Sequence, residues 1–195
     1  MTFIYKKLAD NIFQVDNFLT QLECKEYIEL AELNGMKKAT INTSNGAVEN
    51  NSVRNNTRFT YDSVEFSEEL WKRMKRYLPK TFNARKVDSL NSRIQFYRYD
   101  VGQKFDWHVD GFYTPNPFTT SYFTFFVYLN DDFKGGGTSF KNIGTDEGFI
   151  DFTVQPKAGT ALFFYHRYRH RGDEVIKGIK YAMRSDVLYS SGFGV

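Results

Sequence analysis

The residues of this chain best suited to chemistry are His108, Asp110 and a further histidine downstream. Two imidazoles and one carboxylate make up the facial triad, which holds non-haem Fe(II) and leaves coordination positions open for substrate and oxygen. In a strand, residues i and i+2 point to the same face, so His108 and Asp110 are expected to project together. They lie about 7 Å apart along such a strand, and the third ligand must come from elsewhere in the sheet.

The third ligand has two candidates, because the chain holds only two other histidines, His166 and His170. They share strand parity if the strand between them is regular, so spacing alone leaves both open. A single His-x-Asp tripeptide also arises by chance, and the plainer interpretation is a surface histidine beside a turn aspartate. Lys180 follows ten positions after His170, where a cation would suit a dicarboxylate co-substrate.

The elements that must position these residues are short strands, which dominate the chain from about residue 91 onward. Glycine-rich turns separate them, including the turn-rich loop 130–137. Many short strands with such turns favour a sandwich or barrel. The predicted strands cover residues 93–99, 105–109, 122–129, 138–140, 153–154, 161–165 and 179–189.

Residues 1–90 predict a mixed support region with two helices. Thr20 and Glu23 form a capping box that opens the first helix, and Gly35 is a natural stop. The second helix is predicted to start at Ser67 and to end before Pro79. Both helices are interpreted as scaffold.

A polar stretch rich in Asn, Ser and Gly, residues 42–56, separates the two helices. It is interpreted as a surface loop. The alternative is a mobile lid over a site, because loops of this length are often functional. Arg54 and Arg58 lie at its end and are candidate substrate contacts.

Composition bounds the class of protein. A chain of 195 residues fits one domain, 1–195, and a net charge of +3 without a concentrated basic tract argues against nucleic acid as a partner. A lone cysteine, Cys24, excludes an internal disulfide and suits a reducing compartment.

No stretch approaches transmembrane length, and the first residues lack a signal-peptide pattern, so we expect no membrane partner and a cytoplasmic location. Oligomeric state has no signal in the sequence.

Four segments occur in an order that resembles the Fe(II)- and 2-oxoglutarate-dependent dioxygenases, in particular the prolyl 4-hydroxylase-like branch. Several motifs in the correct order are more specific than any one of them. The resemblance covers roughly residues 91–189, and residues 16–24 (DNFLTQLEC) also look like the family's opening helix. The segments are 99–110 (YDVGQKFDWHVD), 128–140 (YLNDDFKGGGTSF), 156–164 (PKAGTALFF) and 170–180 (HRGDEVIKGIK).

The resemblance implies a fold class and a metal site. The fold is mainly β with flanking helices, and residues 91–189 form a double-stranded β-helix, or jelly roll, as catalytic core. Fe(II) is bound by His108, Asp110 and His170, which makes His166 a partly exposed strand residue. With 2-oxoglutarate and O2 the enzyme would hydroxylate its substrate and release succinate and CO2, with ascorbate as a possible reductant.

The resemblance also implies a pocket for 2-oxoglutarate. Lys180 would hold the C5 carboxylate, the Tyr99 hydroxyl would assist it, and Thr124 would line the pocket from the central strand. Arg184 is a second candidate anchor, since it lies four residues past Lys180 on the same strand face, where the family usually has an uncharged residue. Arg184 could share the C5 carboxylate, meet the C1 end, contact a substrate or pair with Asp186 on that face. Lys180 is preferred, because it matches the family's position for the cation.

The substrate is left open between a prolyl residue in a peptide or protein and a small molecule, with Arg54, Arg58 and Tyr113 as candidate contacts. Three other functions compete with the hydroxylase. One is a non-catalytic jelly-roll binding module, and another is a cupin-like metalloenzyme that does not use 2-oxoglutarate. The third is a nucleic-acid demethylase, which the mild charge disfavours.

Overall fold

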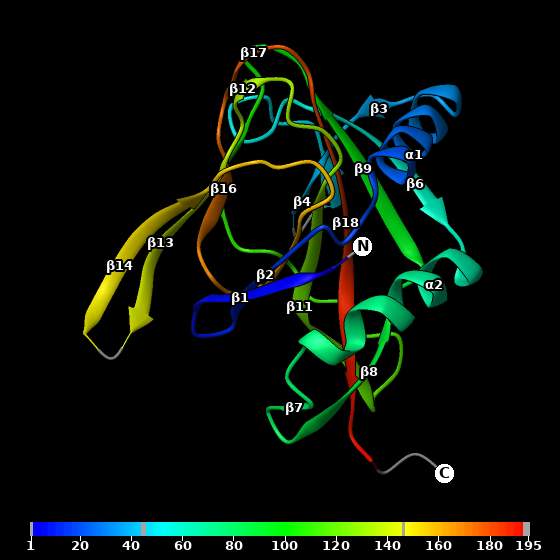
Figure 1. Cartoon of the computed structure of the whole chain (residues 1–195), viewed down its shortest axis with the longest axis vertical. Coiled ribbons are helices and arrows are strands. Elements are labelled where there is room, and N and C mark those ends of the chain that lie inside the picture. Colours follow the sequence, from blue (N-terminus) through cyan, green and yellow to red (C-terminus); the bar gives the residue numbers. More distant parts are fainter. Residues whose placement is uncertain (1, 44–45, 146, 193–195) are drawn as a thin grey trace.

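The computed structural model describes residues 2–43, 46–145 and 147–192 of the chain. Its strands are antiparallel, and most of them belong to two sheets (Figure 1). Figure 1 shows both helices on one side of the larger sheet, while β13 and β14 extend away on the opposite side. This is the mainly β, jelly-roll architecture with flanking helices that the sequence predicted.

The larger sheet has the order β1-β2-β15-β11-β18-β9-β6-β3, with β8 beside β18 and β7 beside β8. Strands from the first 90 residues therefore extend the same sheet that holds the predicted core. The mixed composition of the N-terminal region did not predict β1 or β2. The strands are β1 (Ile4–Ala9), β2 (Ile12–Asp16), β3 (Lys37–Lys38), β6 (Thr57–Asp62), β7 (Thr81–Phe82), β8 (Arg85–Leu90), β9 (Arg93–Tyr99), β11 (Thr119–Tyr128), β15 (Ala161–Tyr165) and β18 (Lys180–Ser190).

The smaller sheet has the order β10-β16-β13-β14 and carries two of the predicted metal ligands. Two strand pairs stand apart from both sheets, β12 with β17 and β4 with β5. The bounds are β10 (Phe105–His108), β13 (Thr138–Thr145), β14 (Gly148–Val154), β16 (His170–Gly172), β12 (Lys134–Gly135), β17 (Val175–Lys177), β4 (Ile41–Thr43) and β5 (Gly46–Val48).

Two central strands, β11 and β18, give the larger sheet two different faces. On β11, Phe123, Phe125 and Val127 are fully buried in the core beneath the helices. Thr124 and Phe126 alternate with them and line a cavity on the opposite face. This alternation follows from the two-residue repeat of a strand. The helices therefore stabilise one face and leave the other free to form a site.

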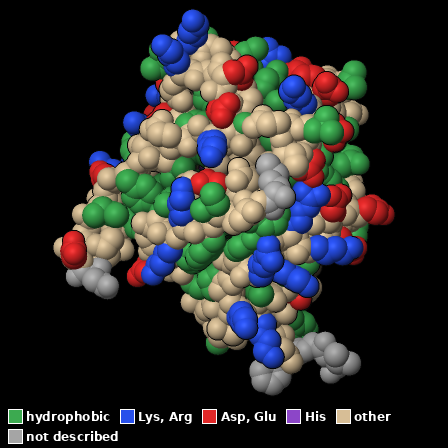
Figure 2. All heavy atoms as spheres, in the orientation of Figure 1, with side chains coloured by type: hydrophobic (Ala, Val, Ile, Leu, Met, Phe, Trp, Pro, Cys, Tyr) green, Lys and Arg blue, Asp and Glu red, His purple; other side chains and the backbone are tan. Residues whose placement is uncertain are grey.

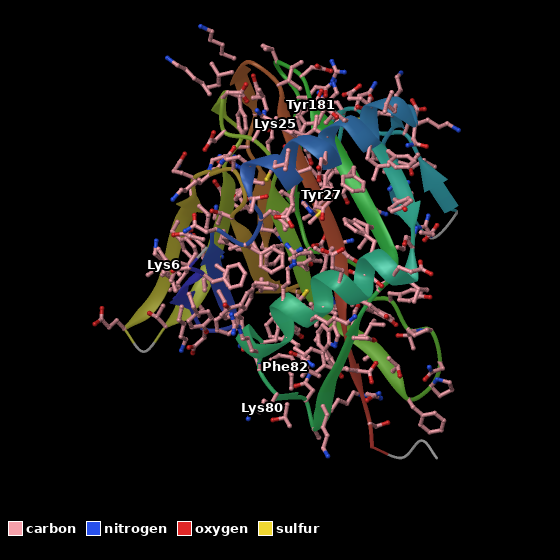
Figure 3. All side chains as sticks on the ribbon, turned by 45° about the vertical axis from the view of Figure 1, so that its right-hand side comes forward. Lys6, Lys25, Tyr27, Lys80, Phe82 and Tyr181 are labelled. Carbon is pink, nitrogen blue, oxygen red and sulfur yellow. The ribbon has the colours of Figure 1, made fainter. Side chains whose placement is uncertain are left out.

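Helix α1 (Gln21–Leu33) begins as predicted. The Thr20 hydroxyl accepts the N–H of Glu23 at 3.1 Å, and the Glu23 carboxylate accepts the N–H of Thr20 at 2.7 Å. This capping box satisfies two amides that the first turn leaves without helical partners. Tyr27 extends from α1 toward the large sheet, where its ring meets Phe66 of the second helix edge-on at 4.9 Å (Figure 3).

The predicted start of the second helix at Ser67 is wrong. Helix α2 (Val64–Met74) begins one turn earlier, because Ser63 is the N-cap and its hydroxyl accepts the N–H of Phe66. Ser67 lies inside the helix, where its hydroxyl donates to the Val64 carbonyl. A short 3-10 turn, Lys75–Tyr77, follows before Pro79.

The predicted loops are partly structured. Within 42–56 the described residues include parts of the β4–β5 hairpin and a turn at 51–53, while residues 44 and 45 lie outside the described ranges. The 130–137 loop contains β12, and the last turn before β13 packs Gly136 against Val175 and Lys180. A Cβ on Gly136 would lie 3.0 Å from the Lys180 side chain, and its φ of +64° also favours glycine.

The surface seen in Figure 2 carries Lys and Arg side chains spread among acidic and neutral ones. That distribution fits the small net charge of +3. In the described part of the chain, no helix is long and apolar enough to cross a bilayer.

Candidate metal centre and co-substrate pocket

Three predicted ligands converge at the edge of the smaller sheet. His108 at the end of β10 pairs directly with His170 at the start of β16. Asp110 lies two residues past β10, and its N–H donates to the His166 carbonyl at 2.9 Å. The three side chains offer ligand atoms within 4.8 Å of one another, and among the described residues they are the group suited to a metal ion. The Asp110 carboxylate lies 3.6 Å from Nε2 of each histidine.

The backbone presents the same nitrogen of both histidines to this point. Nδ1 of His108 lies 2.6 Å from the Asp106 carbonyl, and Nδ1 of His170 lies 2.9 Å from the Tyr168 carbonyl. A carbonyl only accepts, so each Nδ1 carries a proton, and in the neutral imidazole this leaves the lone pair on Nε2. Hydrogen bonds of this kind orient histidine ligands in metal sites. The Phe105 ring stacks on His108 with 3.5 Å between ring centroids and holds its plane.

The charges of the site suit a divalent cation. Burial lowers the pKa of His170 to about 4, so this imidazole is neutral at neutral pH. Burial alone would raise the pKa of Asp110, but Arg184 and the two histidines outweigh it and hold that pKa well below its ordinary value. The site therefore offers the Nε2 atoms of two histidines and one carboxylate, which is the donor set of non-haem Fe(II).

His166 is not part of this cluster, and the expectation that it is partly exposed is wrong. Its side chain is buried, and its ring lies between Tyr165 and Tyr122. Burial lowers the pKa of His166 to about 4. The chain turns between β15 and β16, so the strand parity that kept His166 open as a ligand does not hold.

A cavity of about 770 Å³ opens beside the three ligands. Small-molecule sites span about 300–1,000 Å³, so this one has room for a co-substrate and a second small molecule. Its walls come from the inner face of the larger sheet, from β10 and β16, and from segments 53–54 and 109–113. All ten predicted site residues line it: Arg54, Arg58, Tyr99, His108, Asp110, Tyr113, Thr124, His170, Lys180 and Arg184.

Lys180 lies at one end of the cavity with only 1% of its surface exposed. Its ammonium donates to the Gly136 carbonyl at 2.6 Å and lies over the rings of Tyr99, Phe126 and Tyr128 at 5.1–5.6 Å. Burial lowers its pKa to about 7, with the charge of Asp173 opposing the shift. No carboxylate forms an ion pair with Lys180 among the described residues, so an anion of suitable size would be stabilised there.

Arg184 faces the same cavity but is already paired. Its guanidinium lies 2.9 Å from the Asp186 carboxylate and 3.4 Å from Asp110. The pairing with Asp186, one of the roles expected for Arg184, is thus present. Its second partner, Asp110, is itself a candidate metal ligand.

Thr124 and Tyr99 take different positions around the site. The Thr124 hydroxyl donates to Asp110 at 2.6 Å and so orients the carboxylate. Tyr99 is buried beside Lys180, and burial raises the pKa of its phenol while the charge of Arg54 opposes the rise. Its position next to Lys180 follows from strand pairing, since Lys180 of β18 and Tyr99 of β9 are direct partners.

The three candidate substrate contacts line other parts of the cavity wall. Arg54 is buried between the rings of Tyr97 and Phe105, with its guanidinium carbon 4.6 and 4.3 Å from their centroids. Arg58 of β6 is half-buried and donates to the Thr40 hydroxyl at 3.0 Å. Tyr113 is 44% exposed at the rim.

Several cavity residues were not found from the sequence. Gln95 and Tyr97 lie four and two positions before Tyr99 on β9, so strand parity could have found them. Thr138 had no such local signal, because it reaches the cavity from β13 through sheet pairing and accepts the Tyr128 hydroxyl at 2.6 Å.

Residues 94–185 match the family model described as the 2OG-Fe(II) oxygenase superfamily. The chain belongs to this superfamily. The matched segment includes the three metal-ligand candidates, Lys180 and Arg184. By their description, its members use Fe(II) and 2-oxoglutarate, and the donor set found here fits such an iron.

Curated relatives from Arabidopsis thaliana are prolyl 4-hydroxylases. The chain is 30% identical to "Probable prolyl 4-hydroxylase 11" over 170 residues, which cover 84% of this chain and 55% of that protein. It is 27% identical to "Prolyl 4-hydroxylase 2" over 205 residues, covering 87% of this chain and 64% of that protein. The chain thus spans less than two thirds of these relatives.

Solved prolyl hydroxylases share the fold. The viral collagen prolyl hydroxylase from Paramecium Bursaria Chlorella virus-1, in its 2OG complex, aligns with a TM-score of 0.63 at 22% identity, covering 94% of this chain and 99% of the other. A Trichoplax adhaerens prolyl hydroxylase, solved with a peptide fragment of hypoxia inducible factor, aligns with a TM-score of 0.68 at 15% identity, covering 92% and 83%. At these identities the likeness bears on the fold.

Proposed function

We propose that this protein is an Fe(II)- and 2-oxoglutarate-dependent hydroxylase. The observation that carries the proposal is the combination of a converging His-Asp-His set with a buried lysine that lacks a carboxylate partner, both facing one cavity. With iron and 2-oxoglutarate bound, O2 is consumed, one oxygen atom enters succinate as CO2 leaves, and the other enters a substrate C–H bond as a hydroxyl.

In this proposal the chain's own residues hold and orient the metal. Nε2 of His108, Nε2 of His170 and one oxygen of Asp110 would bind Fe(II). The carbonyls of Asp106 and Tyr168 keep each Nδ1 protonated, and the Thr124 hydroxyl positions Asp110. We therefore assign Thr124 to orientation of the carboxylate.

We assign the C5 carboxylate of 2-oxoglutarate to Lys180. Its ammonium has one protein acceptor, the Gly136 carbonyl, so donors remain for a ligand. Tyr99 lies beside it and would add its hydroxyl. Arg184 is less suited, because Asp110 and Asp186 already occupy its guanidinium. The Arg184 ion pairs favour Lys180 as the anchor.

The proposed substrate is a prolyl residue of a peptide or protein, or a small molecule that enters by the Tyr113 rim. The names of the relatives support the first class. Ascorbate is a further proposed reactant, as a reductant that keeps the iron Fe(II).

The test is a succinate-release assay in air with Fe(II), 2-oxoglutarate, ascorbate and a panel of prolyl peptides and free amino acids. Succinate above the substrate-free rate, lost in the Asp110→Ala variant, is the expected result. Undiminished succinate from Asp110→Ala would contradict the assignment. A matched Asp151→Ala variant, altered on the exposed strand β14, controls for loss of a surface carboxylate.

A further inference from the structure

Two arginines of the cavity wall, Arg54 and Arg58, have no acidic partner among the described residues and are called here the arginine pair. Other arginines of the described chain do have such partners: Arg73, Arg98, Arg171 and Arg184 each form an ion pair. Arg54 is 5% exposed, its side chain donates to the neutral Asn56 amide oxygen at 2.7 Å, and it also lies near the uncharged Tyr99 phenol.

Arg54 also has an unused donor. Its Nη2 is buried and has no hydrogen-bond acceptor among the described residues. A buried donor without an acceptor is destabilising, because it loses water and gains nothing in exchange. Arg58 adds to the imbalance, since burial and then the nearby charge of Arg54 lower its pKa. Two neighbouring guanidinium groups of the cavity wall, without a carboxylate partner among the described residues, form a site that an anion would complete.

This anion site differs from the one at Lys180. In the large sheet, β9 lies between β18 and β6, with Lys180 opposite Tyr99 and Arg58 opposite Tyr97. Two strand spacings, about 10 Å, therefore separate Lys180 from Arg58. One molecule of 2-oxoglutarate bound to the iron and Lys180 therefore leaves Arg58 free, and Arg54, whose charge acts on both Tyr99 and Arg58, lies close to it.

The arginine pair is close to the metal ligands. The Arg54 guanidinium lies 4.3 Å from the Phe105 ring centroid, and Phe105 stacks 3.5 Å from His108. Only the Phe105 ring would thus separate the Arg54 guanidinium, and an anion bound to it, from the iron ligand His108. The part of the molecule between this anion and the reacting carbon must be short, since that carbon has to face the metal.

We propose that the substrate carries a free carboxylate close to the carbon that is hydroxylated, and that Arg54 and Arg58 bind this carboxylate. This inference rests on the proposed hydroxylase function. Arginine forks match carboxylates with two parallel hydrogen bonds, so the pair selects this group. A free amino acid and the C-terminal residue of a peptide both provide it. A residue inside a peptide chain has only amides there and would leave the arginine pair unsatisfied.

The test begins with the protein loaded anaerobically with Fe(II) and 2-oxoglutarate, so that the Lys180 site is filled. Acetate, free L-amino acids and peptides with a free C-terminal carboxylate are then added, each beside its amide. The readouts are the melting temperature and the visible band of the iron complex. We expect at least one carboxylate to raise the melting temperature, and its amide to bind at least about tenfold more weakly. Testing free amino acids and peptides separately shows which of the two classes supplies the carboxylate.

The decisive variant is Arg58→Gln, because Arg58 is half-buried and its substitution leaves the Arg54 packing in place. We expect it to weaken carboxylate binding at least about tenfold while 2-oxoglutarate affinity changes less than about twofold. Arg76→Gln, on the far side of the molecule beside Phe3 and Tyr77, is the matched control and should change neither.

Three outcomes would overturn the inference: amides that bind as well as the carboxylates, an Arg58→Gln variant with unchanged carboxylate affinity, or no response to any carboxylate, acetate included. Each leaves the iron and 2-oxoglutarate band intact. Loss of that band in the wild-type protein would instead contradict the proposed function itself.

Discussion

Two buried cations, Lys180 and Arg184, lie four residues apart on β18 and face the same cavity, yet their surroundings are opposite. Lys180 has aromatic rings and one carbonyl around it. Arg184 has two carboxylates within 3.4 Å. A cation whose partners are inside the protein contributes to the fold, whereas one without an anionic partner is suited to an anion from outside. One face of β18 thus carries both a structural cation, Arg184, and a cation suited to a ligand, Lys180.

The largest expected effect comes from Asp110, the metal-ligand candidate that lies beside Arg184. In Asp110→Ala the iron loses its anionic ligand and Arg184 loses one of its two partners. We expect succinate production to fall to background and anaerobic Fe(II) binding to be lost, as measured by bound iron after gel filtration. Iron retained at one equivalent would show that Asp110 is not a ligand.

Replacement of Lys180 by Met removes the cation and keeps a long side chain. We expect the dissociation constant of 2-oxoglutarate to rise on the order of 100-fold, since a buried charge pair is lost in the complex. The unliganded protein should be as stable as the wild type or more so, because an unpaired buried charge is gone. Lys177→Met, on the exposed part of β17, is the matched control. Unchanged 2-oxoglutarate affinity in Lys180→Met would reassign the anchor.

Arg184→Met should show the reverse pattern. The buried Asp186 carboxylate would lose its partner, so we expect the free energy of unfolding to fall by about 2 kcal/mol in urea titrations. The affinity for 2-oxoglutarate should change less than about threefold, a margin of under about 1 kcal/mol. A large loss of 2-oxoglutarate affinity with little loss of stability would mean that Arg184, not Lys180, anchors the co-substrate.

The pH dependence of stability and of 2-oxoglutarate binding tests the role of Lys180 further. Burial lowers the pKa of Lys180 to about 7 from an ordinary value of 10.5, so the unfolded chain holds this proton over a range where the folded, unliganded protein has released it. Lys180 thus makes the unliganded protein more stable as the pH rises from about 7 toward 10.5. The same deprotonation should weaken 2-oxoglutarate binding about tenfold between about pH 6 and pH 8. Lys180→Arg, which does not titrate there, should remove this slope, and a flat wild-type profile would contradict the expectation.

The smallest effect is expected for Thr124→Val, which removes the hydroxyl that donates to Asp110 but keeps the shape of the side chain. Groups that orient metal ligands contribute about 10–100-fold to metal affinity, and Arg184 still holds Asp110 here. We therefore expect about tenfold weaker Fe(II) binding and unchanged 2-oxoglutarate binding to the iron-loaded protein. Equal iron affinity in Thr124→Val and wild type would show that Arg184 alone positions the carboxylate.

The sequence allowed much of this site to be predicted, and the reasons are local. Lys180 and Arg184 lie on one face of β18, as the two-residue repeat of a strand predicts, and Asp110 lies beside His108 as expected although β10 ends at His108. His170 could be separated from His166 only through the family resemblance, since the turn between β15 and β16 is not evident from spacing.

The surroundings of these residues could not be predicted in the same way. The Gly136 carbonyl at Lys180 and the stacking of Arg54 on Phe105 both depend on contacts between segments far apart in the chain. The start of α2 was missed for a different reason, since Ser63 and Ser67 are both plausible N-caps and the packing of the helix selects between them.

The most direct measurement is an anaerobic absorbance titration of the purified protein with Fe(II) and then 2-oxoglutarate, in the wild type and in Lys180→Met. We predict a weak visible charge-transfer band that forms in the wild type only when both are present, and that needs on the order of 100-fold more 2-oxoglutarate in the variant. A folded, iron-loaded wild-type protein that gives no band at saturating 2-oxoglutarate would contradict the central claim that one cavity binds both.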